Sequence, residues 1–185
     1  MMQKFTVGLL LVLSMFVISC GNNKDEAVKK ITELEKKLLD PNGNPINEVS
    51  AYNLQVEYDD FAMKFAEEPE APEYLFKAAN ISINLGWGES AVKILNKFLE
   101  KFPEHTRAPE AMFFLGFVYD NQINDDAKAG DYYQQFLKKY PSHTFAKDAE
   151  ASIKNLGKTD EELMREFEKM NGDTTAVKDT AAQAA

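Results

Sequence analysis

The chain has 185 residues and a formal net charge of −9 at pH 7, which leaves room for one modest domain. The acidic balance argues against a nucleic-acid partner and against electrostatic docking on anionic lipid headgroups, because both attract clusters of Lys and Arg. The single cysteine excludes a disulfide within the chain.

The first twenty residues differ in kind from the rest. Lys4 gives a weakly positive start, and the apolar run that begins at Val7 is too short to span a bilayer comfortably. We interpret residues 1–19 as a signal peptide; the alternative is an uncleaved membrane anchor. The run ends in Val17-Ile18-Ser19-Cys20, which resembles a lipobox, the cleavage motif of bacterial lipoproteins.

The lipobox resemblance implies that the Cys20 thiol is acylated and that the chain is cut before this residue. Each buried methylene contributes about 0.8 kcal/mol and stable anchoring takes at least two acyl chains, so a triacylated Cys20 would hold the protein on a membrane. A buried free cysteine is the alternative and fits poorly here.

Gly21 is not the aspartate that retains many lipoproteins on the inner membrane. We therefore expect a lipid-anchored tether over 20–24 on the outer membrane, with its periplasmic or surface face left open.

Two helices are expected after the tether. Apolar residues recur at helical spacing over about 25–40, and again from Val49 to Phe65. The segment Pro41-Asn42-Gly43-Asn44-Pro45 between them is rich in turn residues. These features predict an antiparallel helix pair.

An internal repeat occupies the middle of the chain. Residues 98–111 recur as residues 136–149 at an offset of 38, and a fainter copy lies 37 residues upstream at 61–73. The two clear copies share the pattern aromatic-Pro-x-His-Thr-x-Ala. A period of 37 to 38 residues is typical of helical solenoids.

The segments between the copies are predicted to be helix pairs. In the first unit, Gly86-Trp87-Gly88 separates two helices, and Pro103 ends the second because proline cannot continue a helix. In the second unit, the turn is expected over Asn121 to Asp126, and Pro141 ends the second helix. The apolar residues at helical spacing are Leu75, Ala78, Ala79, Ile81, Leu85, Ala91, Ile94, Leu95, Phe98 and Leu99, then Met112, Leu115, Gly116, Tyr119, Ala129, Tyr133, Phe136 and Leu137.

This pattern resembles the tetratricopeptide repeat. The second unit matches the residue types of the family in order, with one extra residue in the turn, at Leu115, Gly116, Tyr119, Ala129, Tyr133, Phe136 and Pro141. The first unit departs twice, since Leu95 is not aromatic and Ser82 stands where an aromatic residue is usual. The resemblance implies an all-α fold, a short right-handed superhelical solenoid of about four antiparallel helix pairs over residues 25–170.

The last of these pairs lies near the C-terminal end. Apolar residues predict one helix from Ala146 to Leu156, which Gly157 stops. Thr159 with Glu162 resembles a capping box before a final helix. Residues 171–185 contain almost no large apolar side chain, so we expect a disordered tail.

The resemblance also implies a concave groove, lined by the first helix of each pair. Its outward positions include Asn80, Asn84, Phe114, Phe117 and Asn121, which we predict to bind the partner. Phe114 and Phe117 make their helix apolar nearly all round, so these two side chains are either sandwiched between neighbouring helices or form an apolar patch.

Trp87 is a further candidate for partner binding, because an exposed tryptophan is a common interface anchor. The alternative is that its ring folds over the turn and packs on Tyr58 or Phe61 of the neighbouring unit.

His105 and His143, the only histidines, occupy the same repeat position about one repeat apart. We expect them either to cap the next helix or to lie in a solvated turn, and not to converge on a metal ion. The sequence contains no HExxH, no CxxC, no glycine-rich phosphate loop and no serine-centred elbow. We therefore expect no enzyme activity, no catalytic residue, no cofactor and no metal site.

The aromatic-Pro-x-x-x-x-Ala linker narrows the resemblance. Over about 70–156, it is similar to the repeats of the outer-membrane barrel-assembly lipoprotein and of the periplasmic cell-division coordinator, and both relatives are scaffolds. We expect a lipid-anchored scaffold that binds another envelope protein or a peptide segment. The alternatives are a self-associating, homo-oligomeric envelope protein and a coordinator of cell division or peptidoglycan.

Overall fold

The structure is a computed structural model, which describes residues 18–38, 47–159 and 161–170. Most of the expected signal peptide, the turn at 41–45 and the tail from residue 171 lie outside the described residues, as does the Cys20 side chain. Within the described part every element is helical, which confirms the predicted all-α class. No helix of that part is long and apolar enough to cross a membrane.

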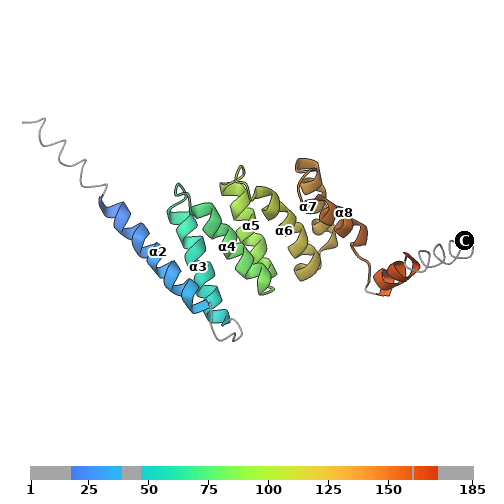
Figure 1. The fold of residues 1–185 in the computed structure, drawn as a ribbon, viewed down its shortest axis with the longest axis horizontal. Coiled ribbons are helices and arrows are strands. Elements are labelled where there is room, and N and C mark those ends of the chain that lie inside the picture. Colours follow the sequence, from blue (N-terminus) through green and yellow to red (C-terminus); the bar gives the residue numbers. More distant parts are fainter. Residues whose placement is uncertain (1–17, 39–46, 160, 171–185) are drawn as a thin grey trace, which may run out of the picture.

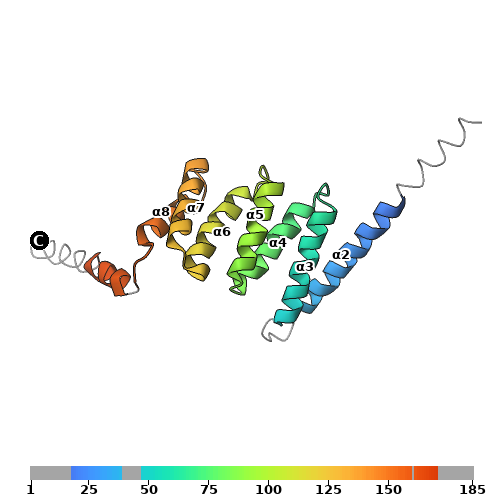
Figure 2. The same cartoon turned by 180° about the vertical axis from the view of Figure 1, so that it is seen from behind.

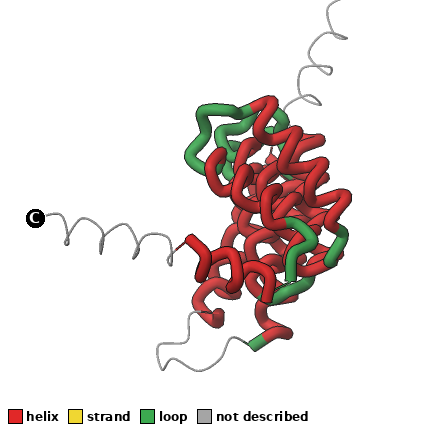
Figure 3. Tube along the Cα trace, turned by 90° about the vertical axis from the view of Figure 1, so that its right-hand side faces the viewer, coloured by secondary structure: helices red, strands yellow, loops and turns green. Residues whose placement is uncertain are grey.

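The helices follow one another along the long axis of the molecule in chain order (Figures 1 and 2). The elements are α2 (Ile18–Leu38), α3 (Glu48–Lys64), α4 (Ala71–Asn84), α5 (Gly88–Lys101), α6 (Ala108–Val118), the π-helix η1 (Tyr119–Ile123), α7 (Asp126–Lys139), α8 (Ala146–Asn155) and a final helical segment over 161–170. Viewed along the stack, the described loops gather at the ends of the helices (Figure 3). This arrangement is the helical solenoid that the repeats predict.

Prolines and a capping aspartate mark the ends of several helices. The helices α4 and α6 each carry a proline in the first turn, where its missing N–H costs nothing. The helices α5 and α7 end at Lys101 and Lys139, just ahead of the two repeat prolines. The side chain of Asp125 caps α7 by accepting a hydrogen bond from the Lys128 N–H at 3.0 Å.

The extra residue of the second unit is accommodated by the π-helix η1. The expected turn at Asn121 to Asp126 is therefore shorter than predicted, since the chain stays helical through Ile123. Asn124 then adopts a left-handed conformation, with φ 60° and ψ 44°, and its N–H donates to Tyr119 O. A π-helix absorbs a single inserted residue without breaking the helix.

The core forms two clusters of buried side chains. One extends from Ile31 in α2 to Val118 in α6, and the other joins α6, α7 and α8 around the fully buried Tyr133 and Phe136. Phe114 packs against both clusters. The solenoid therefore has a continuous apolar interior.

The buried stripe of α6 differs from the predicted one. Leu115 and Gly116 are buried as expected, but Phe113 and Val118 are buried in place of Met112 and Tyr119, which are only half-buried. Packed helices flank α6 on both sides, so more than one stripe of its surface is covered.

Helix α2 belongs to the array. Its Ile31 is 1% exposed within the first cluster, and Lys24 forms ion pairs with Glu68 and Glu70. The segment 20–24, expected as a tether, is part of this helix. Residues 25–38 thus pack on the repeats and do not extend as a free arm.

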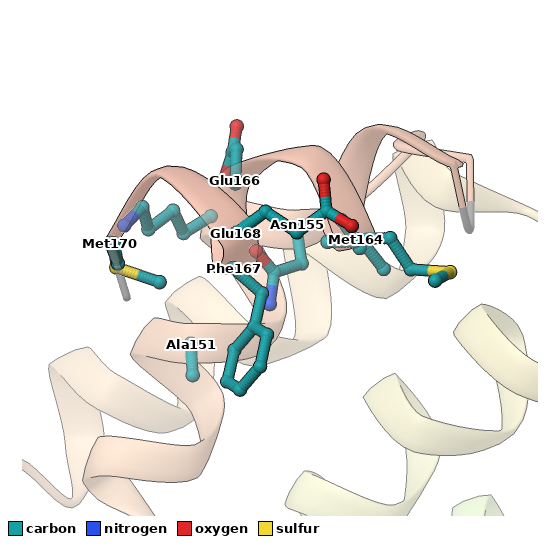
Figure 4. A pocket seen from close by; sticks show the side chains of 9 residues that line it. Ala151, Asn155, Met164, Glu166, Phe167, Glu168 and Met170 are labelled. Atoms are coloured by element: carbon teal, nitrogen blue, oxygen red, sulfur yellow. The ribbon is translucent and has the colours of Figure 1, made fainter. Parts of the chain in front are cut away.

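The final segment 161–170 is less integrated. The predicted capping box is present, because Thr159 N–H donates to Glu162 at 3.0 Å and Glu162 N–H donates to Thr159 Oγ1 at 3.3 Å. Met164 and Phe167 are nevertheless 64% and 62% exposed. Figure 4 shows Phe167 directed toward Ala151 of α8 across an open hollow.

Candidate functional site

The first helix of each pair contributes to one face of the solenoid, which we call the first-helix face. Asn84 near the end of α4 and Asn121 in η1 occupy equivalent positions, 37 residues apart. Each lines a separate hollow. The register of the repeat therefore places similar amide side chains at two successive points of this face.

The α2–α4 hollow has a volume of about 430 Å³ and contains Asn80 and Asn84. Its lining residues are Glu35, Leu38, Leu54, Tyr58, Lys77, Asn80, Ile81 and Asn84. Leu54 and Tyr58 belong to the buried core, whereas Asn84 is exposed. The hollow thus has an apolar floor and a polar rim, the usual composition of a ligand-binding pocket.

Charges at the rim of the α2–α4 hollow compensate each other. The Glu35 carboxylate accepts a hydrogen bond from the Tyr58 hydroxyl at 2.6 Å and pairs with Lys77 Nζ at 2.9 Å. Burial would raise the pKa of Glu35, but the hydrogen bonds from Tyr58 and Lys77 outweigh it and hold this pKa below its usual range. Burial, reinforced by the hydrogen bond to Glu35, raises the pKa of Tyr58. At neutral pH the hollow therefore has no net charge.

The α6–α8 hollow has a volume of about 770 Å³ and is polar and acidic. Its lining residues are Asp120, Asn121, Asn124, Asp126, Asp148, Ala151, Ser152, Asn155, Gly157, Lys158, Thr159 and Leu163. The one lysine among them, Lys158, lies 2.8 Å from both carboxylate oxygens of Glu166. Among the described residues, therefore, three aspartates border the hollow without a lysine or arginine paired to them.

Asp120 is the most enclosed of these aspartates. Burial raises its pKa, a hydrogen bond from the Tyr133 hydroxyl at 3.4 Å opposes the rise, and the nearby charge of Asp126 adds to it. Burial and the repulsion from Asp126 together outweigh the hydrogen bond from Tyr133, so the pKa of Asp120 lies above its usual range. A cation entering the hollow would relieve that repulsion.

The predicted groove residues divide into two groups. Asn80, Asn84 and Asn121 line the hollows, and the Asn121 amide also donates to Phe117 O at 3.0 Å. Phe114 is sandwiched, because its ring lies 6.1 Å from both Phe76 and Phe145. Phe117 is half-buried against the first core cluster. The two phenylalanines thus hold α6 in place between the hollows.

Trp87 lies apart from these residues and lines neither hollow. Its ring is half-buried and contacts Tyr52 of α3 edge-on, with 6.3 Å between ring centroids. The backbone N–H of Trp87 donates to Ser82 O at 2.8 Å, at the turn before α5. The ring packs on the neighbouring unit, although on Tyr52 and not on Tyr58 or Phe61.

The histidines have structural contacts in equivalent turns. His105 Nδ1 accepts the Arg107 N–H at 3.3 Å, and His143 Nδ1 accepts the Phe145 N–H at 3.2 Å. Both histidines lie just ahead of the next helix, but each accepts from the residue at the N-cap, and neither α6 nor α8 has a side-chain cap hydrogen bond, so the expected helix capping is not observed. The described residues contain no group of three or more side chains suited to hold a metal ion.

Sequence reasoning missed the residues that α2 and α3 bring to the face. Glu35, Leu38 and Leu54 border the α2–α4 hollow, but they precede the clear repeats. No sequence motif groups Asp120, Asp126 and Asp148 of the second hollow. These aspartates border one hollow only because η1, α7 and α8 pack together in the tertiary structure.

The family model of the tetratricopeptide repeat matches residues 110–143, which extend from α6 through η1 and α7 into the following turn. The match supports a tetratricopeptide-repeat protein, and repeats of this kind generally mediate binding to other proteins. A comparison with curated proteins gave no match.

Proposed function

We propose that the chain is a lipid-anchored scaffold of the bacterial cell envelope, which holds an extended segment of another envelope protein along the first-helix face. The observation that carries this proposal is the placement of Asn84 and Asn121 at equivalent positions in two hollows of one face. A repeated polar group along a preformed surface suits a ligand that is itself repetitive, such as a polypeptide backbone.

The chemistry of the amide side chain supports this interpretation. An asparagine both donates and accepts hydrogen bonds, which matches the N–H and C=O groups that an extended segment leaves unpaired. The neighbouring helices are held by a packed core, so the surface needs little reorganisation on binding.

The envelope assignment rests on the sequence around Cys20. The lipobox resemblance supports acylation of this residue, and Gly21 in place of the aspartate that retains lipoproteins on the inner membrane supports an outer-membrane location. The linker resemblance points to outer-membrane protein assembly. Only three residues separate Cys20 from Lys24, which is already paired with Glu68 and Glu70 of the array. Because a residue spans at most about 3.6 Å, the anchor would hold the repeats close to the bilayer.

Site-directed crosslinking in living cells tests the proposal. A photoreactive residue at Asn84 or Asn121 of the full-length chain is expected to capture the same partner, identified by mass spectrometry. Asn96 of α5 is the matched control, because it is also an exposed asparagine whose amide donates to the carbonyl four residues before it, at 2.9 Å. Equal capture from Asn96, or none from the two face positions, would refute binding at this face.

The location is tested with Cys20→Ser. This change is expected to abolish incorporation of labelled fatty acid and to release the chain from the membrane fraction. Retention of the label would show that Cys20 is not the acylated residue.

A self-associating envelope protein is the second candidate. The observation that favours it is the apolar side of segment 161–170, where Met164 and Phe167 are more than half exposed. Copies of the chain could associate through this end.

A further inference from the structure

The two hollows of the first-helix face differ in chemistry. The α2–α4 hollow is apolar and its charged pair, Glu35 with Lys77, is internally neutralised. The α6–α8 hollow is acidic and its lysine is occupied by Glu166. The face therefore has a direction, from apolar near α2 to anionic near α8.

From this we infer that the segment held on the face carries a bulky apolar side chain that enters the α2–α4 hollow and a Lys or Arg side chain that faces the α6–α8 hollow. The inference rests on the proposed function and adds the chemical identity and the orientation of the bound segment.

The part of the inference that concerns the apolar side chain follows from the floor of the α2–α4 hollow. Leu38, Leu54 and Ile81 come from three different helices and border the same space. A polar side chain placed there would lose its hydration without gaining partners from this floor. An apolar side chain avoids that loss and gains by leaving water.

The basic half follows from charge complementarity. Asp126 and Asp148 stand in the first turns of α7 and α8, where the helix dipole stabilises carboxylates. The helix dipole therefore stabilises the two aspartates where they stand, but it does not neutralise their negative charge. Together with Asp120 they border one hollow, so a guanidinium or ammonium group is attracted and a carboxylate is repelled.

The spacing of the two side chains follows from helix packing. The α2–α4 hollow lies on the α2 side of α4, and the α6–α8 hollow lies on the α8 side of α6, so both α4 and α6 stand between the two hollows. Packed helices are about 8–10 Å apart. Two helix widths make roughly 20 Å, which an extended chain covers in about six residues. The apolar and basic side chains should therefore be about six residues apart.

Selection from a phage-displayed library of random twelve-residue peptides tests this inference. The bait is the full chain in nanodiscs of neutral phosphatidylcholine, with empty nanodiscs to remove lipid binders. Enriched peptides are expected to combine a bulky apolar residue with Lys or Arg about six positions away, and to be depleted of Asp and Glu. No enrichment, or enrichment of acidic peptides, overturns the inference.

The matched variants separate charge from folding. The double change Asp126→Asn with Asp148→Asn is expected to lower the enrichment of basic residues at least several-fold while the apolar preference persists. Glu48→Gln with Glu89→Gln is the control, because it removes the same charge from the first turns of α3 and α5, outside both hollows. If both double variants lowered the enrichment of basic residues equally, the inferred Lys or Arg side chain would be overturned.

Crosslinking distinguishes this inference from the proposed function. If Asn84 and Asn121 capture a partner segment that lacks the apolar and basic side chains, the scaffold stands and the inference fails. If they capture nothing, both fail.

Discussion

At the scale of single residues, the two helices of each repeat unit approach closely at one equivalent position, which different pairs of residues fill in the two units. A Cβ added at Gly116 would lie 2.6 Å from Cδ1 of the fully buried Tyr133. The equivalent positions in the preceding unit hold Ala79 and Leu95, both fully buried. A larger residue on one helix is thus matched by a smaller one on the other, and the non-aromatic Leu95 goes together with the larger Ala79.

Gly116→Ala is expected to lower the free energy of unfolding by about 1–3 kcal/mol, because the new methyl group overlaps a ring that the core holds in place. Urea unfolding measures the loss. Combining it with Tyr133→Leu, which imitates the Ala79–Leu95 pair, should cost less than the sum of the two single changes.

Gly130→Ala is the control for this experiment. Its added Cβ would lie 3.3 Å from Cδ1 of Leu156, the end of a flexible side chain, and Gly130 lies within α7. The gain in helix propensity of about 1 kcal/mol should offset the contact. If Gly116→Ala and Gly130→Ala had the same effect, steric overlap with Tyr133 would not be the cause.

Ser82 shows how a departure from the family pattern is accommodated. Its side chain is fully buried where Tyr119 stands in the next unit. Its hydroxyl lies 3.3 Å from Ala78 O and 3.2 Å from Ser90 Oγ, and Ser90 also accepts the Gln55 amide at 2.9 Å. A small polar chain of hydrogen bonds thus replaces an aromatic ring.

At the scale of elements, α2 depends on polar contacts as well as on Ile31. Lys30 pairs with Glu57, and Glu35 is bound by both Tyr58 and Lys77. These contacts tie α2 to α3 and α4 and form one wall of the α2–α4 hollow. Weakening them should loosen the helix that completes the candidate site.

The docking of α2 should weaken in acid. The folded-state pKa of Glu35 lies below its ordinary value of 4.5, so its contribution is fully present above about pH 4.5 and is lost as the pH falls through the lowered value. Wild-type chain should exceed Glu35→Gln in stability by about 1 kcal/mol at pH 7, and thermal unfolding should show this difference shrinking below pH 4.5.

Glu33→Gln controls for the general effect of removing a charge from α2. Glu33 is exposed on the same helix, so its replacement removes the same charge from α2 and should leave the stability at pH 7 close to that of the wild type. A difference between wild type and Glu35→Gln that stayed constant down to pH 3 would mean that the carboxylate is not responsible.

At the scale of the whole molecule, the two described ends of the solenoid differ. Contacts run mainly between helices that are neighbours along the chain, and a stack of this kind needs polar outer faces at its ends to stay soluble. Helix α2 presents charged residues such as Lys36 and Lys37 to solvent. Segment 161–170 instead exposes Met164 and Phe167.

We expect this apolar end to cause concentration-dependent self-association. Sedimentation of residues 21–185 should show a species larger than a monomer at high concentration, and Phe167→Glu should shift it to a monomer with unchanged helical circular dichroism. Val49→Glu is the control, because Val49 is 70% exposed on α3 and should leave association intact. A strict monomer at every concentration removes the self-associating alternative.

Much of the fold could be predicted because its signals are local. The repeat of aromatic-Pro-x-His-Thr marks two of the turns between helix pairs, the capping box precedes the last segment, and apolar spacing identifies the helices. The same register placed Asn84 and Asn121 at equivalent points of one face. These features depend on residues close together in the chain, whose conformational preferences act before any tertiary contact forms.

The tertiary structure alone decided the rest. The docking of α2, the burial of Phe113 in place of Met112, the contact of Trp87 with Tyr52 and the two hollows all depend on side chains from different helices. The sequence by itself determined which segments are helical and how they repeat. Which side chains meet was decided by the packing of each helix against its neighbours, because a helix face is buried or exposed only once another helix covers it.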